Sequence, residues 1–262
     1  MITSAELLEA YDHELRSDSE TPSAVAVKQH GPLRLVTFAG GRGFVTYRDL
    51  GIANAQGMQR LVADALAHFE ADSTIVRIEW KTRGHDRAPG LHDALVENGF
   101  TAEEPEPIML GEARRLDRDA ALPRGMTLRT VRTETDVRAM SAMQDIAFGD
   151  PVSDEMANAV LRRLALDDGM ELWVAEIGGE IVSAGRLEPV EGTLFAGIWG
   201  GATLQQWRGH GIYRALTAER ARSAIRLGKK LIHSDSTEHS RPILERAGLT
   251  KVSTTTPYKW FR

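Results

Sequence analysis

The chain has 262 residues and a formal net charge of −5, with 32 Lys and Arg against 37 Asp and Glu. It has no cysteine, which excludes disulfides, thiolate metal sites and thiol nucleophiles. No apolar run reaches the roughly 18 residues of a membrane span, and the first 16 residues are amphipathic, unlike a signal peptide. We therefore expect a cytoplasmic globular protein without a membrane partner.

The first half of the chain alternates segments typical of strands and helices. Strands are predicted at 24–28, 33–38, 43–50 and 73–80, and helices at 4–16, 57–71 and 90–99. The GGRG stretch at 40–43 joins two strands, which favours a hairpin turn over a phosphate-binding loop. Residues 111–125 are charged and close on Pro123 and Gly125, so they are a candidate linker.

The second half repeats this alternation. Strands are predicted at 126–133, 193–204 and 231–236, a hairpin at 171–190 turning at Gly178-Gly179, and a strand-rich tail up to residue 262. Helices are predicted at 133–148 and 153–166, from the junction at 205–216 to about 228, and at 240–248. This mixture predicts an α/β sheet.

An internal repeat supports two related halves. The stretch LVENGFTAEEPEPIML (95–110) resembles LERAGLTKVSTTTPYKW (244–260), with Gly99 against Gly248 and Pro107 against Pro257. The order of strands and helices before each stretch also agrees. Two short helix–Gly–strand units that are alike by chance remain the alternative.

The stretch QQWRGHGIYRAL (205–216) lies where a strand gives way to a helix. Gly209 and Gly211 permit positive φ and close approach of a ligand. The first N–H groups of a helix have no intrahelical acceptor and its dipole favours anions, so the junction suits phosphate or pyrophosphate. Arg208 adds a permanent charge able to contact phosphate oxygens. A plain glycine-rich turn is the alternative.

With this junction and the surrounding order of elements, residues 126–262 resemble a GNAT-family N-acetyltransferase domain. The family's pyrophosphate loop has the form Q/R-x-x-G-x-G/A, here with Tyr213 in place of the final Gly or Ala. Gly248-Leu249 matches the Gly-Phe pair that ends the family's last helix. The resemblance implies an α/β (α+β) fold with a mixed central sheet of GNAT type flanked by helices.

Together with the repeat, the resemblance predicts two related halves in tandem. Residues 1–118 are expected to be a degenerate GNAT-like domain without the cofactor loop, 119–125 a linker, and 126–262 the acetyltransferase domain. The chain reads GIANAQG before the 57–71 helix, with nothing like the RGHG junction. The first half is therefore expected to support or shape the acceptor site.

The resemblance implies acetyl-CoA as co-substrate and no metal. The residues expected at its pyrophosphate are Arg208, Gly209, His210, Gly211, Ile212 and Tyr213. The residues expected to pair with its pantetheine arm are Ala202, Thr203 and Leu204. Gly200 and Gly201 suit a β-bulge in that strand, and an N–H near Ala202 or Thr203 would polarise the thioester carbonyl.

Direct acetyl transfer needs a base that deprotonates the acceptor ammonium. Asp235 is the first candidate, because it ends the 231–236 strand, where α/β sheets place ligands. His233 on the same face and Glu188 at the end of the hairpin strand are further candidates. A shift of register by one residue would instead present Ser234 and Ser236.

The reaction also needs an acid for the leaving thiolate. Leu244 occupies the position at which many family members have a catalytic Tyr, and Thr237 that of a frequent Asn. Ser240 is the nearest remaining hydroxyl and the candidate acid, with a helix N-cap as the alternative. Tyr213 and Tyr258 are other phenols that the fold could bring to the site.

The predicted function is acetyl transfer from acetyl-CoA to a primary amine of a small molecule or peptide, and the acceptor cannot be read from the sequence. A non-catalytic acyl-CoA-binding or sensing module is the alternative, suggested by Leu244. Acidic residues predominate in the first half, so no nucleic acid partner is expected. Four tryptophans could line an acceptor pocket, although core positions are commoner: Trp173, Trp199, Trp207 and Trp260. His85-Asp86 has no partner at metal-site spacing.

Overall fold

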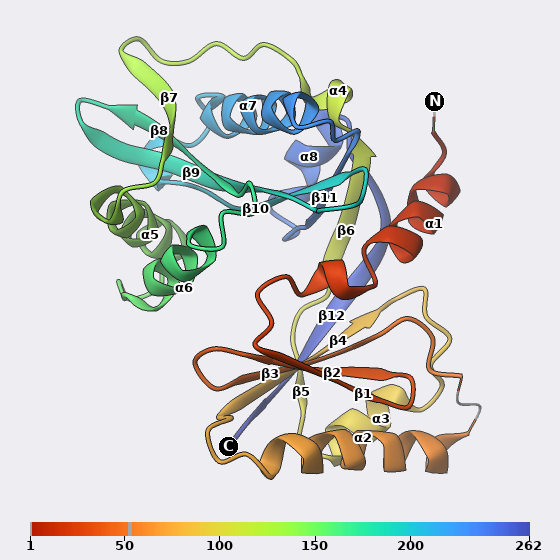
Figure 1. The fold of residues 1–262 in the computed structure, drawn as a ribbon. Helices are drawn as coiled ribbons and strands as arrows, with labels where there is room; N and C mark the ends of the chain where they lie inside the picture. The colour runs from red at the N-terminus through yellow and green to blue at the C-terminus, as the bar shows by residue number, and fades with distance from the viewer. Residues whose placement is uncertain (1, 52–53) are drawn as a thin grey trace. The chain divides into compact units, whose positions relative to one another are not determined.

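Two compact units make up the chain in this computed structural model, which describes residues 2–51 and 54–262 (Figure 1). The first unit contains the described residues up to Ile108 together with Val252–Arg262, and the second contains Met109–Lys251. Within the described ranges, no helix has the length and apolar character needed to cross a bilayer.

The first unit is a sheet with strand order β1-β2-β3-β4-β12, in which the short β5 also pairs with β12. Neighbouring strands are antiparallel except β3 and β4, which are parallel and connected through α2. The strands are β1 (Ala26–His30), β2 (Leu33–Phe38), β3 (Arg42–Tyr47), β4 (Arg77–Arg83), β5 (Thr101–Ala102) and β12 (Thr250–Phe261). The helices are α1 (Ser4–Glu14), the 3₁₀ turn η1 (Asp18–Glu20), α2 (Ala55–Glu70) and α3 (Leu91–Glu97).

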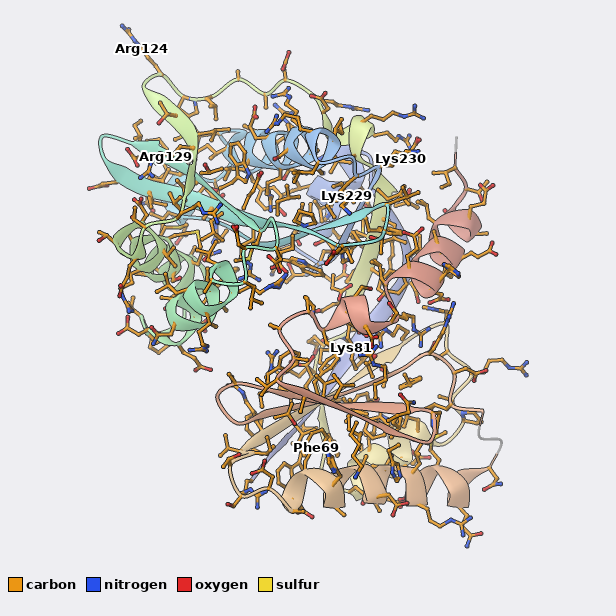
Figure 2. All side chains as sticks on the ribbon, viewed as in Figure 1. Phe69, Lys81, Arg124, Arg129, Lys229 and Lys230 are labelled. Carbon is orange, nitrogen blue, oxygen red and sulfur yellow. The ribbon has the colours of Figure 1, made fainter. Side chains whose placement is uncertain are left out.

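The core of the first unit lies between its sheet and the helices α2 and α3. Phe69 of α2, labelled in Figure 2, and Trp80 of β4 are both fully buried there. The Phe69 ring leaves no room beside the sheet at Gly43, where a Cβ would lie 2.9 Å from it. The GGRG stretch is the hairpin turn that the sequence predicts, since Phe38 and Arg42 pair at its base.

The second unit is built around strands in the order β6-β11-β10-β9-β8-β7. All the pairs from β7 to β10 are antiparallel, whereas β10 and β11 are parallel. The strands are β6 (Glu106–Glu112), β7 (Met126–Val131), β8 (Glu171–Ile177), β9 (Glu180–Pro189), β10 (Phe195–Thr203) and β11 (Leu231–Asp235). The helices are α4 (Ala113–Leu116), α5 (Glu134–Phe148), α6 (Glu155–Leu164), the 3₁₀ turn η2 (Gln205–Trp207), α7 (Ile212–Arg226) and α8 (Arg241–Ala247).

Helices cover both faces of this second sheet (Figure 1). On one face, α7 packs on β9 and β10 through small residues such as Ala221 and Ala224, against Leu187 and Ile198. On the other face, α5 and α6 enclose a separate cluster that includes Val137, with Leu172 and Val174 of β8 among its members. Side chains of β9, β10 and β11 that point to the α5 face are therefore separated by the sheet from α7.

Each half of the chain places its last strand in the other unit. β12 follows α8 in the sequence, yet from Val252 onward it belongs to the first unit, where it pairs with β4. β6 follows α3, yet its residues from Met109 onward belong to the second unit, where β6 is the neighbour of β11. The sequence analysis predicted two contiguous domains, 1–118 and 126–262. The observed units are not contiguous, because most of β12 and most of β6 belong to the unit with which they pair and not to the unit that precedes them in the sequence.

The predicted repeat is present in the geometry of the two halves. Both contain a parallel strand pair connected by a long helix, α2 in one and α7 in the other. Both then have a short helix ending at a glycine with positive φ, Gly99 at 83° and Gly248 at 118°. A buried apolar residue follows each glycine, Phe100 and Leu249. The mixed sheet flanked by helices is the predicted fold class.

The segment predicted as a linker is partly ordered into secondary structure. Its first residues complete β6 and form α4, and only 117–125 has neither helix nor strand. Asp117 and Asp119 both bind Arg222 of α7, at 2.6 and 2.7 Å. This segment therefore follows the surface of α7 within the second unit.

Candidate active site

The carboxyl ends of β10 and β11 separate from one another. Their ladder covers only Phe195–Gly197 opposite Leu231–His233, although both strands continue. Beyond it, Ser234 Oγ donates a hydrogen bond to the carbonyl of Ile198 at 2.9 Å. The register between β10 and β9 also shifts between Trp199 and Ala202, so the β-bulge predicted at Gly200-Gly201 is present. Among the described strands, none pairs with the end of β10 on its β11 side.

The three residues predicted to pair with the pantetheine arm differ in what their backbone offers. Leu204 donates its N–H to Val182 of β9, and the Ala202 carbonyl accepts from Ser183 Oγ, so both groups point toward β9. Because backbone groups alternate in direction along a strand, those of Thr203 point to the other side. Thr203 is thus the residue whose N–H faces the separated strand end, whereas the N–H of Leu204 is already used.

The loop that follows begins α7 without a side-chain cap. Gly209 and Gly211 have φ of 81° and 79°, values that require glycine, and Gly211 is the N-cap residue. In the described parts of the chain, no acceptor binds the backbone N–H groups of residues 209–213. Five donors at the positive end of a helix of 15 residues form a site for an anion.

Two arginines lie beside this loop, and only Arg208 was expected there. Arg208 donates through Nε to the carbonyl of Thr203 at 3.0 Å and through Nη2 to that of Ala147 at 2.8 Å. Its guanidinium therefore fixes the loop to β10 and α5, which the predicted phosphate contact did not anticipate. Arg214 is exposed, and its Nη2 lies 3.7 Å from the position that a Cβ on Gly211 would take. Among the described residues no acceptor binds the Arg214 guanidinium, so it is a free cation next to the loop, and the sequence reasoning missed it.

The candidate bases lie on the face of the sheet that α5 and α6 cover. Glu188, Gly197 and His233 are aligned across β9, β10 and β11. The missing side chain of Gly197 makes room for the Trp199 and His233 rings, which meet edge-to-face at 5.1 Å. Asp235 follows two residues after His233 on this half-buried face, while Ser234 and Ser236 are buried on the other. His233 and Asp235 therefore face α5 and α6, and the alternative in which Ser234 and Ser236 would face them does not apply.

Glu188 is the weaker of the two carboxylate candidates. Its Oε1 accepts from Arg186 Nε at 3.2 Å, and its Oε2 lies 3.7 Å from Arg163 Nη1. Both carboxylate oxygens of Glu188 therefore already face guanidinium groups, which leaves less of the group available to contact an acceptor ammonium.

The contacts of the candidate acids also distinguish them from one another. Leu244 is buried in the core of the second unit, in keeping with the absence of a phenol there. Ser240 begins α8 without capping it, and its Oγ donates to the carbonyl of Thr237 at 3.2 Å. Tyr258 belongs to the first unit and binds His92. The Tyr213 ring packs directly on the bulge, since a Cβ on Gly201 would lie 3.0 Å from its hydroxyl.

A buried arginine under the bulge was not foreseen from the sequence. Arg220 of α7 is 1% exposed and donates to the carbonyls of Leu216 and Arg186 and to Thr217 Oγ1. Gly185 of β9 makes room for it, as a Cβ there would meet Nη1 at 2.5 Å. Burial lowers the pKa of Arg220, an effect that its contact with Tyr213 opposes. Gly185 was the one sequence signal for this arginine, because a glycine within a strand can mark the close approach of another group.

The family of the second unit follows from a direct match. Residues 137–249, from α5 to the end of α8, match the Acetyltransferase (GNAT) family. These residues form a GNAT-family domain within the second unit. The activity that the family indicates is acetyl transfer with acetyl-CoA as co-substrate. No curated protein matches the sequence.

Solved structures of GNAT proteins resemble the whole chain in fold. A GCN5-related N-acetyltransferase from Kribbella flavida has 17% sequence identity and a TM-score of 0.69, covering 99% of this chain and 96% of its own. A GCN5-related N-acetyltransferase from Sphaerobacter thermophilus has 17% identity and a TM-score of 0.64, with 99% and 94% covered. A tandem GNAT protein from the clavulanic acid biosynthesis pathway has 12% identity and a TM-score of 0.60, with 99% and 97% covered. At these identities the likeness concerns the fold, and it includes a tandem arrangement.

The residues of this GNAT domain fit the co-substrate of the family. The uncapped α7 N-terminus suits a pyrophosphate, and Arg214 adds a cation beside it. The unpaired side of β10 at Thr203 suits an extended amide-bearing arm. When bound, acetyl-CoA would supply the thioester as acetyl donor.

The corresponding helix start in the first unit is closed by its own side chain. Asn54 caps α2 by accepting a hydrogen bond from the Gly57 N–H at 2.8 Å. Of the stretch GIANAQG, residues 52–53 lie outside the described part of the chain. The described helix start therefore differs from that of α7, where Gly211 offers no cap.

The charged residues of the first unit form structural networks. His85 connects Ser253 and Asp12 through its two ring nitrogens, at 2.7 and 3.1 Å, and Asp12 is shared with Arg16. Across the described chain, no group of three or more His, Asp or Glu side chains has the arrangement of a metal site. Of the four tryptophans considered for an acceptor pocket, Trp199 lies on the α5 face against His233. The other three pack against the cores: Trp173, Trp207 and Trp260.

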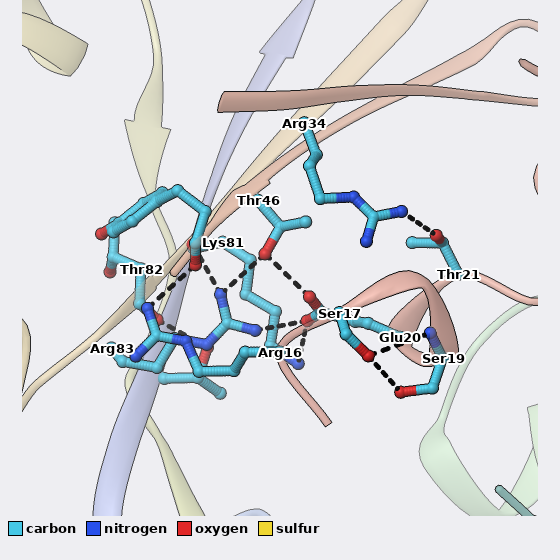
Figure 3. Close-up of polar contacts among 12 residues, drawn as sticks. Arg16, Ser17, Ser19, Glu20, Thr21, Arg34, Thr46, Lys81, Thr82 and Arg83 are labelled. Carbon is cyan, nitrogen blue, oxygen red and sulfur yellow. Dashed lines mark hydrogen bonds and ion pairs between the residues drawn. The ribbon is translucent and has the colours of Figure 1, made fainter. Parts of the chain in front are cut away.

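Glu20 is the centre of the second network (Figure 3). It binds Arg83 and Thr46, and Lys81 lies 3.8 Å away. Burial raises the pKa of Glu20, but the charges of Arg83 and Lys81 outweigh burial and hold it below its usual value. A carboxyl group whose pKa is depressed in the folded state contributes stability at neutral pH, and this contribution is lost as the pH falls through the folded pKa.

Proposed function

We propose that the chain is an acetyl-CoA-dependent N-acetyltransferase that transfers an acetyl group directly to a primary amine, with its active site in the second unit. The observation that carries the proposal is the continuity of three features: the separated end of β10, the bulge at Gly200-Gly201, and the uncapped glycine loop before α7. Together they supply a pairing edge, an activating N–H and an anion site along one path.

The residues present would share the chemistry as follows. The Thr203 N–H would stabilise the negative charge on the carbonyl oxygen as the amine adds. Asp235 would take a proton from the acceptor ammonium, directly or through one water. The C–N bond forms as the C–S bond breaks, and the thiolate receives a proton as it leaves. Tyr213 is a better placed acid than Ser240, because its phenol lies against the bulge while the Ser240 hydroxyl is bound to Thr237.

The first unit would contribute no second co-substrate site. The support is Asn54, whose side chain satisfies the helix start that would otherwise receive the pyrophosphate. We propose instead that this unit supports or shapes the acceptor site, as the tandem arrangement suggests.

The burial of Leu244, which replaces the usual phenol, favours one rival: a non-catalytic acyl-CoA-binding module. Thiol release is measured with acetyl-CoA against a panel of amines, beside calorimetric titration with acetyl-CoA. Binding together with amine-dependent thiol release supports the enzyme. Binding without release for any amine supports the rival, and absence of binding removes both.

A further inference from the structure

Arg186 of β9 lies beside the bulge at Gly200-Gly201, on the face of the sheet that α5 and α6 cover. Its side chain is 19% exposed, so most of the side chain is removed from water. A Cβ placed on Gly200 would lie 3.8 Å from both Cζ and Nη1 of Arg186. Arg186 also pairs across the sheet with Trp199, the residue that begins the bulge. An arginine is thus placed next to the site proposed for acetyl transfer, without being part of the co-substrate loop.

The protein leaves much of the hydrogen-bonding capacity of Arg186 unused. Nε donates to Glu188 at 3.2 Å, and Nη1 meets only the sulfur of Met156 at 3.7 Å. Sulfur is a weak acceptor, and a guanidinium has five N–H donors. No other acceptor in the described ranges binds this side chain. A guanidinium with unfilled donors, on a side chain that is mostly buried, is a strong receptor for a carboxylate, which it can bind through two parallel hydrogen bonds.

The charges around Arg186 are arranged in opposite signs across the face. Arg163 is satisfied mainly by Asp168 at 2.5 Å, so Glu188 partly balances Arg186. Asp235 ends β11 on the other side of Trp199. The face therefore offers a cation on β9 and a carboxylate on β11, and Trp199 of the intervening strand β10 lies on the same face. This order is complementary to a zwitterion whose ammonium faces Asp235 and whose carboxylate faces Arg186.

We propose that the acceptor is an amino acid or a compound of similar chemistry, with a carboxylate close to the reacting amine, and that Arg186 is the specificity residue that binds this carboxylate. The proposal rests on the proposed function of the same site. It explains why a charged side chain is kept at the reacting end of the sheet with incomplete pairing.

The test uses the full chain and matched probes: each of the common amino acids and its carboxamide, which has the same amine without the negative charge. We expect the wild type to acetylate carboxylates in preference to the amides. Arg186→Gln should raise KM for carboxylates at least tenfold, change KM for the amides less than threefold, and leave the Kd of acetyl-CoA unaltered. Calorimetric titration of amino acid into the CoA-loaded protein provides a readout independent of turnover.

Arg163→Gln is the matched control, because it removes a guanidinium from the same Glu188 without touching the bulge. It should keep the preference for carboxylates. A wild type that favours no carboxylate over its amide, in turnover or binding, overturns the proposal. So does an equal loss of kcat for both probe classes in Arg186→Gln, which would assign Arg186 to the thioester. Failure to bind acetyl-CoA at all would instead refute the proposed function.

Discussion

Replacing Gly209 with glutamate should abolish acetyl-CoA binding without unfolding the protein. A Cβ at this position meets no atom within 4 Å, so the substitution introduces no clash. Its φ of 81° costs a non-glycine residue roughly 1–2 kcal/mol. The new carboxylate would lie about 5 Å from a bound phosphate, where at an effective dielectric constant of about 20 the repulsion is about 3 kcal/mol. A loss of that size weakens binding by more than about 100-fold.

Gly228→Glu is the matched control for this variant. Gly228 has a φ of 77° and equally open surroundings, but it lies beyond the opposite end of α7. Both variants should therefore lower Tm by a similar amount, about 2–8 °C for a chain of this size. Calorimetric titration with acetyl-CoA should then separate them, with near wild-type Kd for Gly228→Glu. If Gly209→Glu binds within threefold of its control, the pyrophosphate does not lie on this loop.

Three further predictions concern catalysis, folding and acid stability. Asp235→Asn should lower kcat/KM by about 10²- to 10⁴-fold on the acidic limb of the pH profile with unchanged acetyl-CoA Kd, and a loss below threefold would exclude Asp235 as the base. A fragment of residues 119–262 should fail to fold as a monomer, because it lacks β6 and leaves β12 without β4. Circular dichroism and size-exclusion chromatography would test this, and a cooperatively folded, monomeric fragment would contradict the pairing of β12 with the first unit. Glu20→Gln should lower the free energy of unfolding by about 3 kcal/mol at pH 7, because it leaves Arg83 buried without its carboxylate. In denaturant titrations this difference should shrink as the pH falls below about 4, and a difference independent of pH would refute the role of Glu20.

The sequence predicted the features that depend on neighbouring residues. The bulge at Gly200-Gly201 and the start of α7 at Gly211 follow from backbone freedom that only glycine supplies, so the residue type reveals the conformation. The hairpin at Gly178-Gly179 was found for the same reason. The strand face of Asp235 stayed open in the sequence, because Leu231 and Ile232 are adjacent and both apolar and so set no alternation along β11.

Side-chain direction and long-range pairing were beyond that reasoning. Arg208 has the expected charge, yet it binds two carbonyls brought to it by β10 and α5. Arg186 and Arg220 are ordinary arginines in the sequence, and only the assembled sheet shows that one lies over the bulge and the other beneath it. The strand that pairs with β12 could not be predicted either, because the alternating pattern of β12 fits the edge of either sheet.

The exchanged last strands have a consequence for how the chain is made. β4 leaves the ribosome with its pairing edge exposed, and β12, which covers this edge, begins only at Thr250, long after β4 ends at Arg83. At about 5–20 residues per second, translation leaves that edge open for roughly 10–40 seconds. During this time it can pair with β12 of another, completed copy, because its own β12 has not yet been made. Crowded synthesis should therefore produce interlocked dimers whose units are correctly folded but shared between two chains.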